Sequence, residues 1–299
     1  MPMITLPARH NAPETAVYVE TMLGKDSRHL GDNHRPVSIL LPGGPGGNHL
    51  VYNEIKDELA RYTDLVLWDP RSCGDSQFSD AQFCTIDHYI DDIEALRLQL
   101  NIEKPIIIGG SYGSMTALGY AIKYSKNLIG LCCLAGTAHG QFFEHALLNL
   151  ARVRATNEQI DLVEKLLTGT IASSEEMDLY YNTLMPLYIY TQQPVSSPVP
   201  APKPRPIHVI NSAFKLGGFL RTFDWRPRLH EIAVPTRLIC GDHDWINDLC
   251  FSEEMLAGIR AGNSDVDLVV LKNCGHFMWR DQREAFLEAV IGFVKRFVR

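Results

Sequence analysis

Short β-branched runs alternate with longer amphipathic stretches along most of the chain. The runs typical of strands are Val37–Leu41, Leu65–Trp68, Ile106–Ile108, Gly130–Leu134, Thr236–Cys240 and Val266–Leu271. Apolar residues recur at helical spacing over His88–Gln99, Tyr112–Tyr124 and Gln282–Phe297. This alternation is typical of βαβ units and predicts an α/β fold in which helices flank a mostly parallel central sheet. An antiparallel pair of strands around Val17 to Met22 is expected at the N-terminal edge of the sheet.

The strand pattern stops after Leu134 and resumes only at Thr236. The chain between them has helical candidates at 142–153, 157–167 and 174–185. We therefore expect a helical cap over residues 138–223, inserted into a core formed by residues 1–137 and 224–299. Residues 194–206 include six prolines, which exclude a helix or a central strand and predict an extended connector.

Composition and charge exclude several classes of function. With 45% hydrophobic and 21% charged residues, the chain has the composition of an ordinary globular protein. Its net charge of −7 argues against nucleic-acid or membrane-surface partners, because both require a basic surface. The first residues lack a cationic segment followed by an apolar one, and no apolar run is long enough to span a membrane, so a cytoplasmic location is expected. The seven cysteines include no C-x-x-C pair, so neither a zinc ribbon nor a redox dithiol is predicted.

The segment Gly109-Gly110-Ser111-Tyr112-Gly113 is a G-x-S-x-G motif between an apolar strand and a helical stretch. In this context the motif is typical of a nucleophile elbow, a strained turn that lifts the serine hydroxyl out of the sheet edge. The flanking glycines are needed because a Cβ at either position would collide with the neighbouring strand and helix. Ser111 is therefore the predicted nucleophile, whereas Ser114, on the next helical turn, is expected to be structural.

The first predicted parallel strand runs into Pro42-Gly43-Gly44-Pro45-Gly46-Gly47. A segment without large side chains lets backbone N–H groups approach a ligand closely. The negative oxygen of a tetrahedral intermediate needs two such donors, and we expect them to be the N–H groups of Gly44 and Tyr112. Phosphate binding is not favoured, because neither G-K-[ST] nor G-x-G-x-x-G follows this strand.

A serine hydroxyl is a poor nucleophile unless a nearby base accepts its proton. With a G-x-S-x-G elbow the triad order is Ser, then Asp or Glu, then His after the last strand, which predicts His276 as the base. The acid follows the preceding strand, where Asp242 and Asp244 are alternatives. Asp244 is favoured because it has the loop length to reach back to His276. Asp248 is expected to be a solvated loop or helix-cap residue.

With these residues placed, the chain resembles the α/β-hydrolase superfamily over nearly its whole length. It is most similar to the proline iminopeptidase group of serine peptidases and their hydrolase relatives, which carry H-G-G-P-G, D-x-R-G-x-G-x-S, G-G-S-[WY]-G, G-x-x-D and G-H in this order. The matching segments here are Pro42–Gly46, Asp69–Ser76, Gly109–Gly113, Gly241–Asp244 and Gly275–His276. The resemblance implies an α/β-hydrolase fold with an inserted cap and serine hydrolase chemistry that uses no cofactor and no metal.

The departures from this pattern concern the substrate. Pro42 replaces the family histidine, and peptidase members are expected to hold the substrate's amino group with acidic residues. Here Trp245 follows Asp244, and Ala213 stands where the cap acid is expected. We expect the substrate to contact Trp245, Phe277 and Glu144, the last as a possible substitute for the missing acids. Without such charges the site would favour a neutral or apolar acyl group.

Two further assignments rest on the residues themselves. Asp69 and Arg71 are expected to form a structural ion pair, although in the related family this segment shapes the wall near the oxyanion loop. Among the remaining histidines, His49 and His139 are those that could border the pocket.

The sequence thus predicts a serine hydrolase that acts on a small molecule or a short peptide. The scissile bond is either an N-terminal prolyl amide or an ester or lactone, and both alternatives stay open. Functions of other classes on the same fold are a catalytically inert binding protein, a lyase or a cofactor-free oxygenase.

Overall fold

The computed structural model describes residues 3–9, 11–25, 27–191 and 205–298. Within these ranges eight strands form one sheet in the order β1-β2-β4-β3-β5-β6-β7-β8. The strands are β1 (Met3–Leu6), β2 (Thr15–Met22), β3 (Val37–Leu41), β4 (Asp64–Trp68), β5 (Ile106–Gly110), β6 (Gly130–Leu134), β7 (Thr236–Gly241) and β8 (Val266–Leu271). The pairings from β4 to β8 are parallel, while β1 and β2 are antiparallel. The predicted fold and its antiparallel edge are confirmed.

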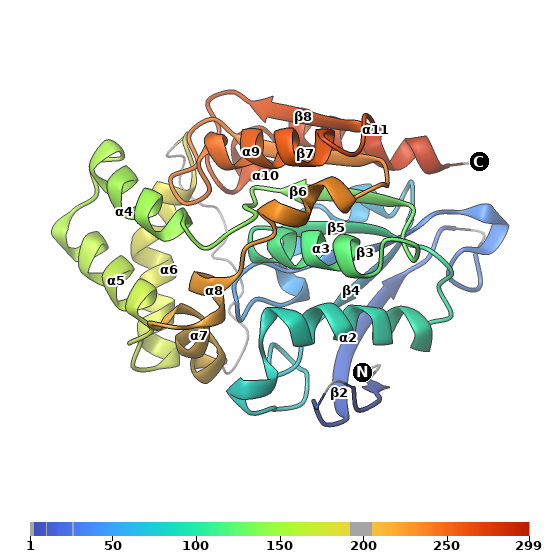
Figure 1. The fold of residues 1–299 in the computed structure, drawn as a ribbon, viewed down its shortest axis with the longest axis horizontal. Coiled ribbons are helices and arrows are strands. Elements are labelled where there is room, and N and C mark those ends of the chain that lie inside the picture. The colour runs from blue at the N-terminus through green and yellow to red at the C-terminus, as the bar shows by residue number, and fades with distance from the viewer. Residues whose placement is uncertain (1–2, 10, 26, 192–204, 299) are drawn as a thin grey trace.

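The helices in these ranges cover both faces of the sheet and one end of the molecule (Figure 1). Their bounds are α1 (Lys56–Leu59), α2 (Ile86–Gln99), α3 (Tyr112–Lys123), α4 (Phe142–Arg152), α5 (Asn157–Thr168), α6 (Ser174–Tyr188), α7 (Ile207–Phe214), α8 (Phe219–Thr222), α9 (Leu249–Arg260), α10 (Met278–Asp281) and α11 (Arg283–Val294). Short 3-10 turns lie at Asp32–His34, His49–Tyr52, Ala81–Phe83, Arg226–Glu231 and Lys295–Phe297. None of the helices so described has both the length and the apolarity that crossing a bilayer requires.

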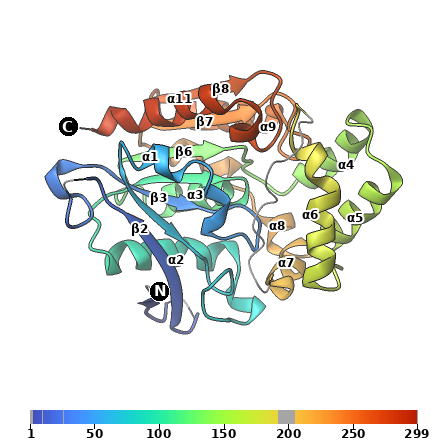
Figure 2. The same ribbon diagram turned by 180° about the vertical axis from the view of Figure 1, so that it is seen from behind.

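Each parallel strand is buried on both faces because helices cover both sides of the sheet. Along β3, Ile39 and Leu41 join the core under α2, α3 and α9, whereas Leu40 points into the core under α1 and α11. The two helical layers can be compared in Figures 1 and 2, which view the molecule from opposite sides. This double burial explains why the strands are nearly continuous apolar runs in the sequence.

The predicted helices outside the insertion correspond to α2, α3 and α11. On α11, Phe286, Val290 and Phe293 of the predicted apolar face are buried, while Phe297 lies in the following 3-10 turn and is half-buried. The helix α9 was not predicted from the sequence pattern. This helix begins after Asp248, whose side chain accepts a hydrogen bond from the N–H of Cys250 at 3.4 Å, which confirms the expected helix cap.

The helices α4 to α8, here called the cap helices, lie between β6 and β7 in the chain and gather at one end of the molecule (Figures 1 and 2). The two segments that join them to the sheet run side by side. The N–H of Gly140 donates to the carbonyl of Phe223 at 3.1 Å, and the N–H of Trp225 donates to that of Ala138 at 2.8 Å. Residues 194–204 of the expected extended connector lie outside the described residues.

Candidate active site

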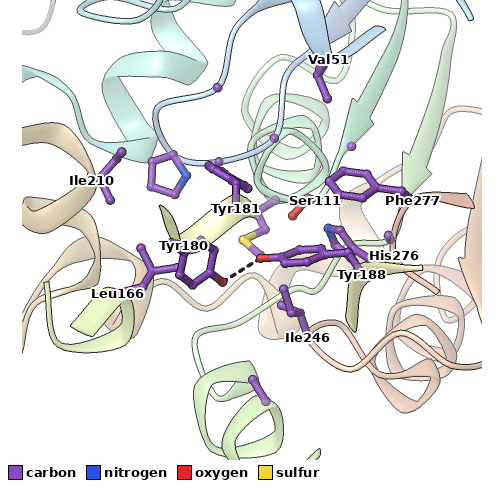
Figure 3. Close-up of a pocket in the computed structure, with 18 of the residues that line it drawn as sticks. Val51, Ser111, Leu166, Tyr180, Tyr181, Tyr188, Ile210, Ile246, His276 and Phe277 are labelled. Carbon is purple, nitrogen blue, oxygen red and sulfur yellow. Dashed lines mark hydrogen bonds between the residues drawn. The ribbon is translucent and has the colours of Figure 1, made fainter. Parts of the chain in front are cut away.

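The predicted site residues meet at the carboxyl edge of the sheet, beneath the cap helices. The strands β3, β5, β7 and β8 run parallel, so the loops that follow them emerge at the same edge. Ser111 follows β5, Asp244 follows β7 and His276 follows β8. Ser111 and His276 line one pocket, and Figure 3 shows both side chains within it.

Ser111 occupies a strained turn between β5 and α3. Its backbone has φ 54° and ψ −119°, a conformation that costs a non-glycine residue energy and persists only where the surrounding structure enforces it. The N–H of Ser111 donates to the carbonyl of Leu134 at 2.8 Å, which ties the turn to β6. A Cβ at Gly109 would overlap the carbonyl of Gly113, and one at Gly113 would overlap that of Leu41. The steric reason predicted for both glycines is therefore confirmed.

His276 and Asp244 form a buried pair. The Nδ1 of His276 lies 2.6 Å from Oδ2 of Asp244, and the two residues are 6% and 1% exposed. The other carboxylate oxygen of Asp244 accepts hydrogen bonds from the N–H groups of Ile246 and Asn247, at 2.9 and 3.1 Å. With Nδ1–H donating to the carboxylate, Nε2 is the nitrogen left free to accept a proton.

Asp242, the alternative acid, has other partners. Its Oδ1 lies 2.7 Å from Nδ1 of His243 and accepts a hydrogen bond from the N–H of Cys274 at 3.3 Å. Partial burial opposes ionisation, but these hydrogen bonds outweigh it and lower the pKa of Asp242. Of the two carboxylates that the sequence left open, only Asp244 is paired with His276 in the described part of the chain.

The loop that carries His276 is held by the end of α6. The carbonyl of Tyr188 accepts hydrogen bonds from the N–H groups of His276 at 2.9 Å and Phe277 at 3.2 Å. The carboxylate of Asp281 accepts from the N–H of Gly275 at 2.8 Å and also from the N–H groups of Tyr190 and Thr191, at 2.8 and 2.9 Å. No sequence motif pointed to Tyr188 or Asp281. The contacts between the His276 loop and the end of α6 join segments about ninety residues apart.

The glycine-rich loop after β3 approaches Ser111 closely. A Cβ at Gly43 would lie 3.3 Å from the Cβ of Ser111, and the following Gly44 has φ 127°, which an L side chain rarely adopts. Within the described residues, neither the N–H of Gly44 nor that of Tyr112 donates to a protein acceptor. Tyr112 is the first residue of α3, where backbone N–H groups have no partner inside the helix.

Ser111 and His276 make no direct hydrogen bond to each other in the described structure. Bonds between a nucleophile and its base are often long until a substrate is bound, and they tighten in the reacting complex. The strained turn and the His276–Asp244 pair are already formed, so only the distance between the side chains of Ser111 and His276 has to shorten.

The pocket between the sheet edge and the cap is a cavity of about 150 Å³ with mainly apolar walls. Trp245 and Phe277, both predicted to contact substrate, line it. Glu144 does not, because α4 turns Phe142 and Ala146 inward and leaves Glu144 exposed on the opposite face, so its prediction as an anchor is wrong.

The ionisable Asp, Glu, Lys, Arg and His residues that line the pocket are basic in the described part of the chain. Among the described residues, no Asp or Glu lines the pocket, and Arg205 and His276 are its only basic residues. The same residues contain no group of three or more His, Cys, Asp or Glu side chains suited to hold a metal ion.

The predicted ion pair between Asp69 and Arg71 is wrong. Asp69 instead accepts a hydrogen bond from the backbone N–H of His49 at 2.8 Å and lies 2.7 Å from its Nδ1, while Arg71 pairs with Asp92 at 2.5 Å. Asp69 and Arg71 are two residues apart, and the turn directs their side chains to different partners. His49 is buried against Asp69 and does not line the pocket.

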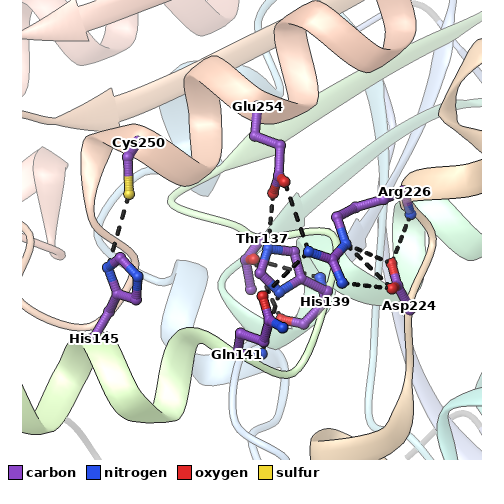
Figure 4. Close-up of polar contacts among 8 residues, drawn as sticks. All are labelled: Thr137, His139, Gln141, His145, Asp224, Arg226, Cys250 and Glu254. Carbon is purple, nitrogen blue, oxygen red and sulfur yellow. Dashed lines mark hydrogen bonds and ion pairs between the residues drawn. The ribbon is translucent and has the colours of Figure 1, made fainter.

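His139 also lies away from the pocket, at the junction of core and cap (Figure 4). Its Nε2 lies 2.7 Å from the carboxylate of Glu254 on α9, and its Nδ1 accepts a hydrogen bond from the N–H of Gln141 at 3.2 Å. Beside it, Arg226 pairs with Asp224 at 2.7 Å. These contacts fasten the two connecting segments to each other and to α9.

Known proteins are similar to this chain over most of its length. The chain is 25% identical to a proline iminopeptidase of Saccharolobus solfataricus over 268 residues, which covers 86% of this chain and 84% of that protein. It is also 25% identical to a proline iminopeptidase of Flavobacterium johnsoniae over 287 residues, covering 89% and 92% of the two chains.

Solved structures agree in fold. Proline iminopeptidase of Mycobacterium smegmatis superposes with a TM-score of 0.74 at 21% identity, over 99% of this chain and 98% of that one. A thermophilic esterase from Thermogutta terrifontis superposes with a TM-score of 0.68 at 19% identity over both whole chains. The family model for the alpha/beta hydrolase fold matches residues 36–279, which include every candidate site residue named above. The chain therefore belongs to the alpha/beta hydrolase fold family.

Proposed function

We propose that this protein is a serine hydrolase that cleaves an ester or amide bond through an acyl-enzyme. The observation that carries the proposal is the pairing of His276 with a buried Asp244 at 2.6 Å in the pocket that also contains Ser111 in its strained turn. A binding protein would have no need of a buried acid that orients a histidine in the same pocket as a half-buried, strained serine. The relatives named proline iminopeptidase and esterase also favour a hydrolase.

In the proposed reaction Ser111 Oγ attacks the substrate carbonyl while Nε2 of His276 accepts its proton. Asp244 keeps the imidazole in the productive tautomer and stabilises the imidazolium as it forms. His276 then gives the proton to the leaving group. A water molecule then attacks the acyl-enzyme while His276 accepts its proton. His276 returns the proton to Ser111 Oγ as the acyl group leaves, which regenerates the free serine.

The oxyanion that develops on the carbonyl would be held by the N–H groups of Gly44 and Tyr112. Both are backbone donors without a protein acceptor in the described residues, on either side of the nucleophile. Fixed donors of this kind stabilise the transition state more than the ground state, and one such donor contributes about 10²- to 10³-fold in rate.

The walls of the pocket favour a neutral and mainly apolar acyl group, as in a carboxylesterase or lactonase. A substrate ammonium would lose its hydration there without gaining a carboxylate partner among the described residues. The second candidate is an aminopeptidase that releases N-terminal proline, which the names of the sequence relatives favour.

A fluorophosphonate probe tests the nucleophile. We expect it to label the wild-type protein and not Ser111→Ala. Labelling that persists in Ser111→Ala, or no labelling of the wild type, would contradict the serine hydrolase proposal.

Two arylamides that differ only in the amino group test the substrate class. Prolyl and cyclopentanecarbonyl amides of the same fluorescent amine have rings of the same size, and the phenyl ester of cyclopentanecarboxylic acid extends the series to an ester. We expect the ester to be cleaved and the carbocyclic amide to have the higher kcat/KM of the two amides. A kcat/KM for the prolyl amide more than about tenfold above its carbocyclic analogue, equivalent to 1.4 kcal/mol, would favour the aminopeptidase instead.

A further inference from the structure

Two tyrosine hydroxyls face each other inside the mainly apolar pocket. Tyr180 and Tyr188 both belong to α6, line the pocket, and are 1% and 6% exposed. Their hydroxyl oxygens lie 2.8 Å apart and share one hydrogen bond, drawn as a dashed line in Figure 3. We call these two residues the tyrosine pair.

The tyrosine pair retains an unused hydrogen-bond donor. Two phenols contribute two O–H groups, and the bond between them uses one. In the described part of the chain neither hydroxyl has another hydrogen-bond partner. Burial raises the pKa of both phenols, so both keep their protons at neutral pH. One O–H group therefore remains to be satisfied in an apolar environment, which is costly for a buried donor.

The tyrosine pair is close to the reacting groups. The ring of Tyr188 lies edge-on to the imidazole of His276, with 5.6 Å between ring centroids, and stacks on Phe277 at 5.2 Å. Figure 3 shows the Tyr188 hydroxyl turned away from His276 toward Tyr180 and Leu166, deeper under the cap. An acyl chain attached to Ser111 and extending into the apolar part of the pocket would pass this hydroxyl.

The walls of the pocket also contain buried hydrogen-bond donors that have no acceptor in the described residues. Trp245 and Trp279 line the pocket, and in the described residues their buried indole N–H groups have no hydrogen-bond partner. No carboxylate of the described chain lines the cavity. The chemistry of the walls thus suits a ligand that brings acceptor oxygens and no ammonium group.

We propose that the tyrosine pair is a subsite for the acyl part of the substrate, and that this acyl part is an apolar chain carrying one acceptor oxygen, as an ether or ketone. The inference rests on the proposed hydrolase function, because it concerns the group transferred to Ser111. The free O–H of the pair donates to the acceptor oxygen, and the apolar walls enclose the rest of the chain.

The preference between an acyl chain with an ether oxygen and one without it distinguishes this subsite from simple apolar burial. An ether oxygen that replaces a methylene lowers the affinity for an apolar pocket, because the oxygen loses its hydration without compensation. A hydrogen-bond donor that reaches the ether oxygen has the opposite effect and raises the affinity for the oxygen-containing chain. 4-Nitrophenyl heptanoate and its 4-oxa, 5-oxa and 6-oxa analogues have nearly the same length and shape, so they isolate the effect of the oxygen and its position.

The test compares kcat/KM for these esters, corrected for their rates of spontaneous hydrolysis, in the wild type and the double variant Tyr180→Phe/Tyr188→Phe. The double variant is needed because a single Tyr→Phe change would free the remaining O–H to donate to the substrate. We expect one oxa ester to exceed heptanoate by about tenfold in the wild type, the contribution of one neutral hydrogen bond. In the double variant the same ratio should fall to one or below. Tyr181→Phe is the matched control, since Tyr181 lines the pocket from the same helix but is outside the pair, and there the ratio should persist.

Three outcomes would overturn the inference. If heptanoate is cleaved and no oxa ester is preferred, the subsite is refuted while the hydrolase proposal stands. If the double variant keeps the ratio, or if Tyr181→Phe lowers it as much as the double variant does, the effect belongs to general pocket polarity and not to the tyrosine pair. If no ester is cleaved and no fluorophosphonate labels Ser111, the hydrolase proposal fails and the inference fails with it.

Discussion

The proposed nucleophile and its proposed acid–base partners are held by different parts of the molecule. Ser111 is fixed by the core alone, through β6, the flanking glycines and the carbonyl of Leu41. The His276 loop is instead bound to the end of cap helix α6 through the carbonyl of Tyr188. The Asp244 loop is bound to cap helix α4, where the side-chain amide of Asn149 donates to the carbonyl of Trp245 at 3.1 Å.

This difference indicates that the cap has two roles. It encloses the pocket, and it also holds the loops of the proposed acid and base. Substitution of Ser111 should therefore abolish the chemistry outright, while substitutions at the contacts with the cap should slow proton transfer and leave the proposed nucleophile in place.

The largest effect is expected at the nucleophile. Ser111→Ala should lower kcat/KM by at least about 10⁴-fold, because the remaining binding groups and oxyanion donors cannot form an acyl-enzyme. The assay is hydrolysis of the best ester, with thermal unfolding to show that the fold is retained. Ser114→Ala, on the same helix, should keep most of the activity, and a similar loss in both variants would refute the assignment.

The next effect concerns the two carboxylates that follow β7. Asp244→Asn should lower kcat by about 10⁴-fold, because the amide stabilises the unproductive tautomer of His276 and cannot stabilise imidazolium. Asp242→Asn is the matched control, since Asp242 bonds to His243 and Cys274 and not to His276. We expect it to change kcat by less than about tenfold. Equal losses in the two variants would contradict the acid assignment.

A smaller effect is expected where the cap holds the base. Asp281→Asn replaces a carboxylate that accepts from three backbone N–H groups by an amide, whose NH₂ group would oppose one of them. We expect kcat to fall by about tenfold with KM nearly unchanged, because the loop carries the base and these contacts do not touch the substrate.

Asp265→Asn is the control for this positioning role. Asp265 is a carboxylate in an exposed ion pair with Arg296, so its substitution should leave kcat at the wild-type value. A change of KM alone in Asp281→Asn, or equal kcat values in Asp281→Asn and the wild type, would show that the cap does not position His276.

The smallest effect is expected at the junction of core and cap. Asp224 is 38% exposed and pairs with Arg226, so Asp224→Asn should lower the free energy of unfolding by less than about 1 kcal/mol. The hydrogen bond from Arg226 lowers the pKa of Asp224 below its usual value. The stabilisation is therefore complete above about pH 4 to 5 and is lost as the pH falls through the lowered pKa.

Urea unfolding of the wild type and of Asp224→Asn, repeated as the pH is lowered, checks the direction of this pH dependence. The difference between wild type and Asp224→Asn should shrink as the solution becomes more acidic. A difference that grows with acidity would mean that Asp224 is destabilised by its surroundings instead.

Much of the fold could be predicted from the sequence because its signals are local. The parallel strands are continuous apolar runs bounded by turn residues, and the strained turn at Ser111 is encoded by glycines on both sides. The helix α9 was missed because only the cap residue Asp248 marks its start. The order Ser111, Asp244, His276 followed from the topology of the sheet.

Other parts of the site could not be predicted because they depend on contacts between distant segments. Loop length favoured Asp244 over Asp242 in the sequence, but the 2.6 Å contact between Asp244 and His276 forms only in the folded loop. Glu144 was chosen for its charge, but the turn of α4 decides that it faces solvent.

The sequence by itself determined the fold class, the sheet with its inserted cap helices, and the residues that can do chemistry. The tertiary structure alone decided how closely Asp244 approaches His276 and which walls enclose the pocket. It also decided that Tyr180 and Tyr188 share a hydrogen bond in its interior. The physical reason is distance along the chain: a turn or a strand is specified by its own residues, whereas a pocket is lined by side chains from the core loops and the cap helices, which meet only when the chain has folded.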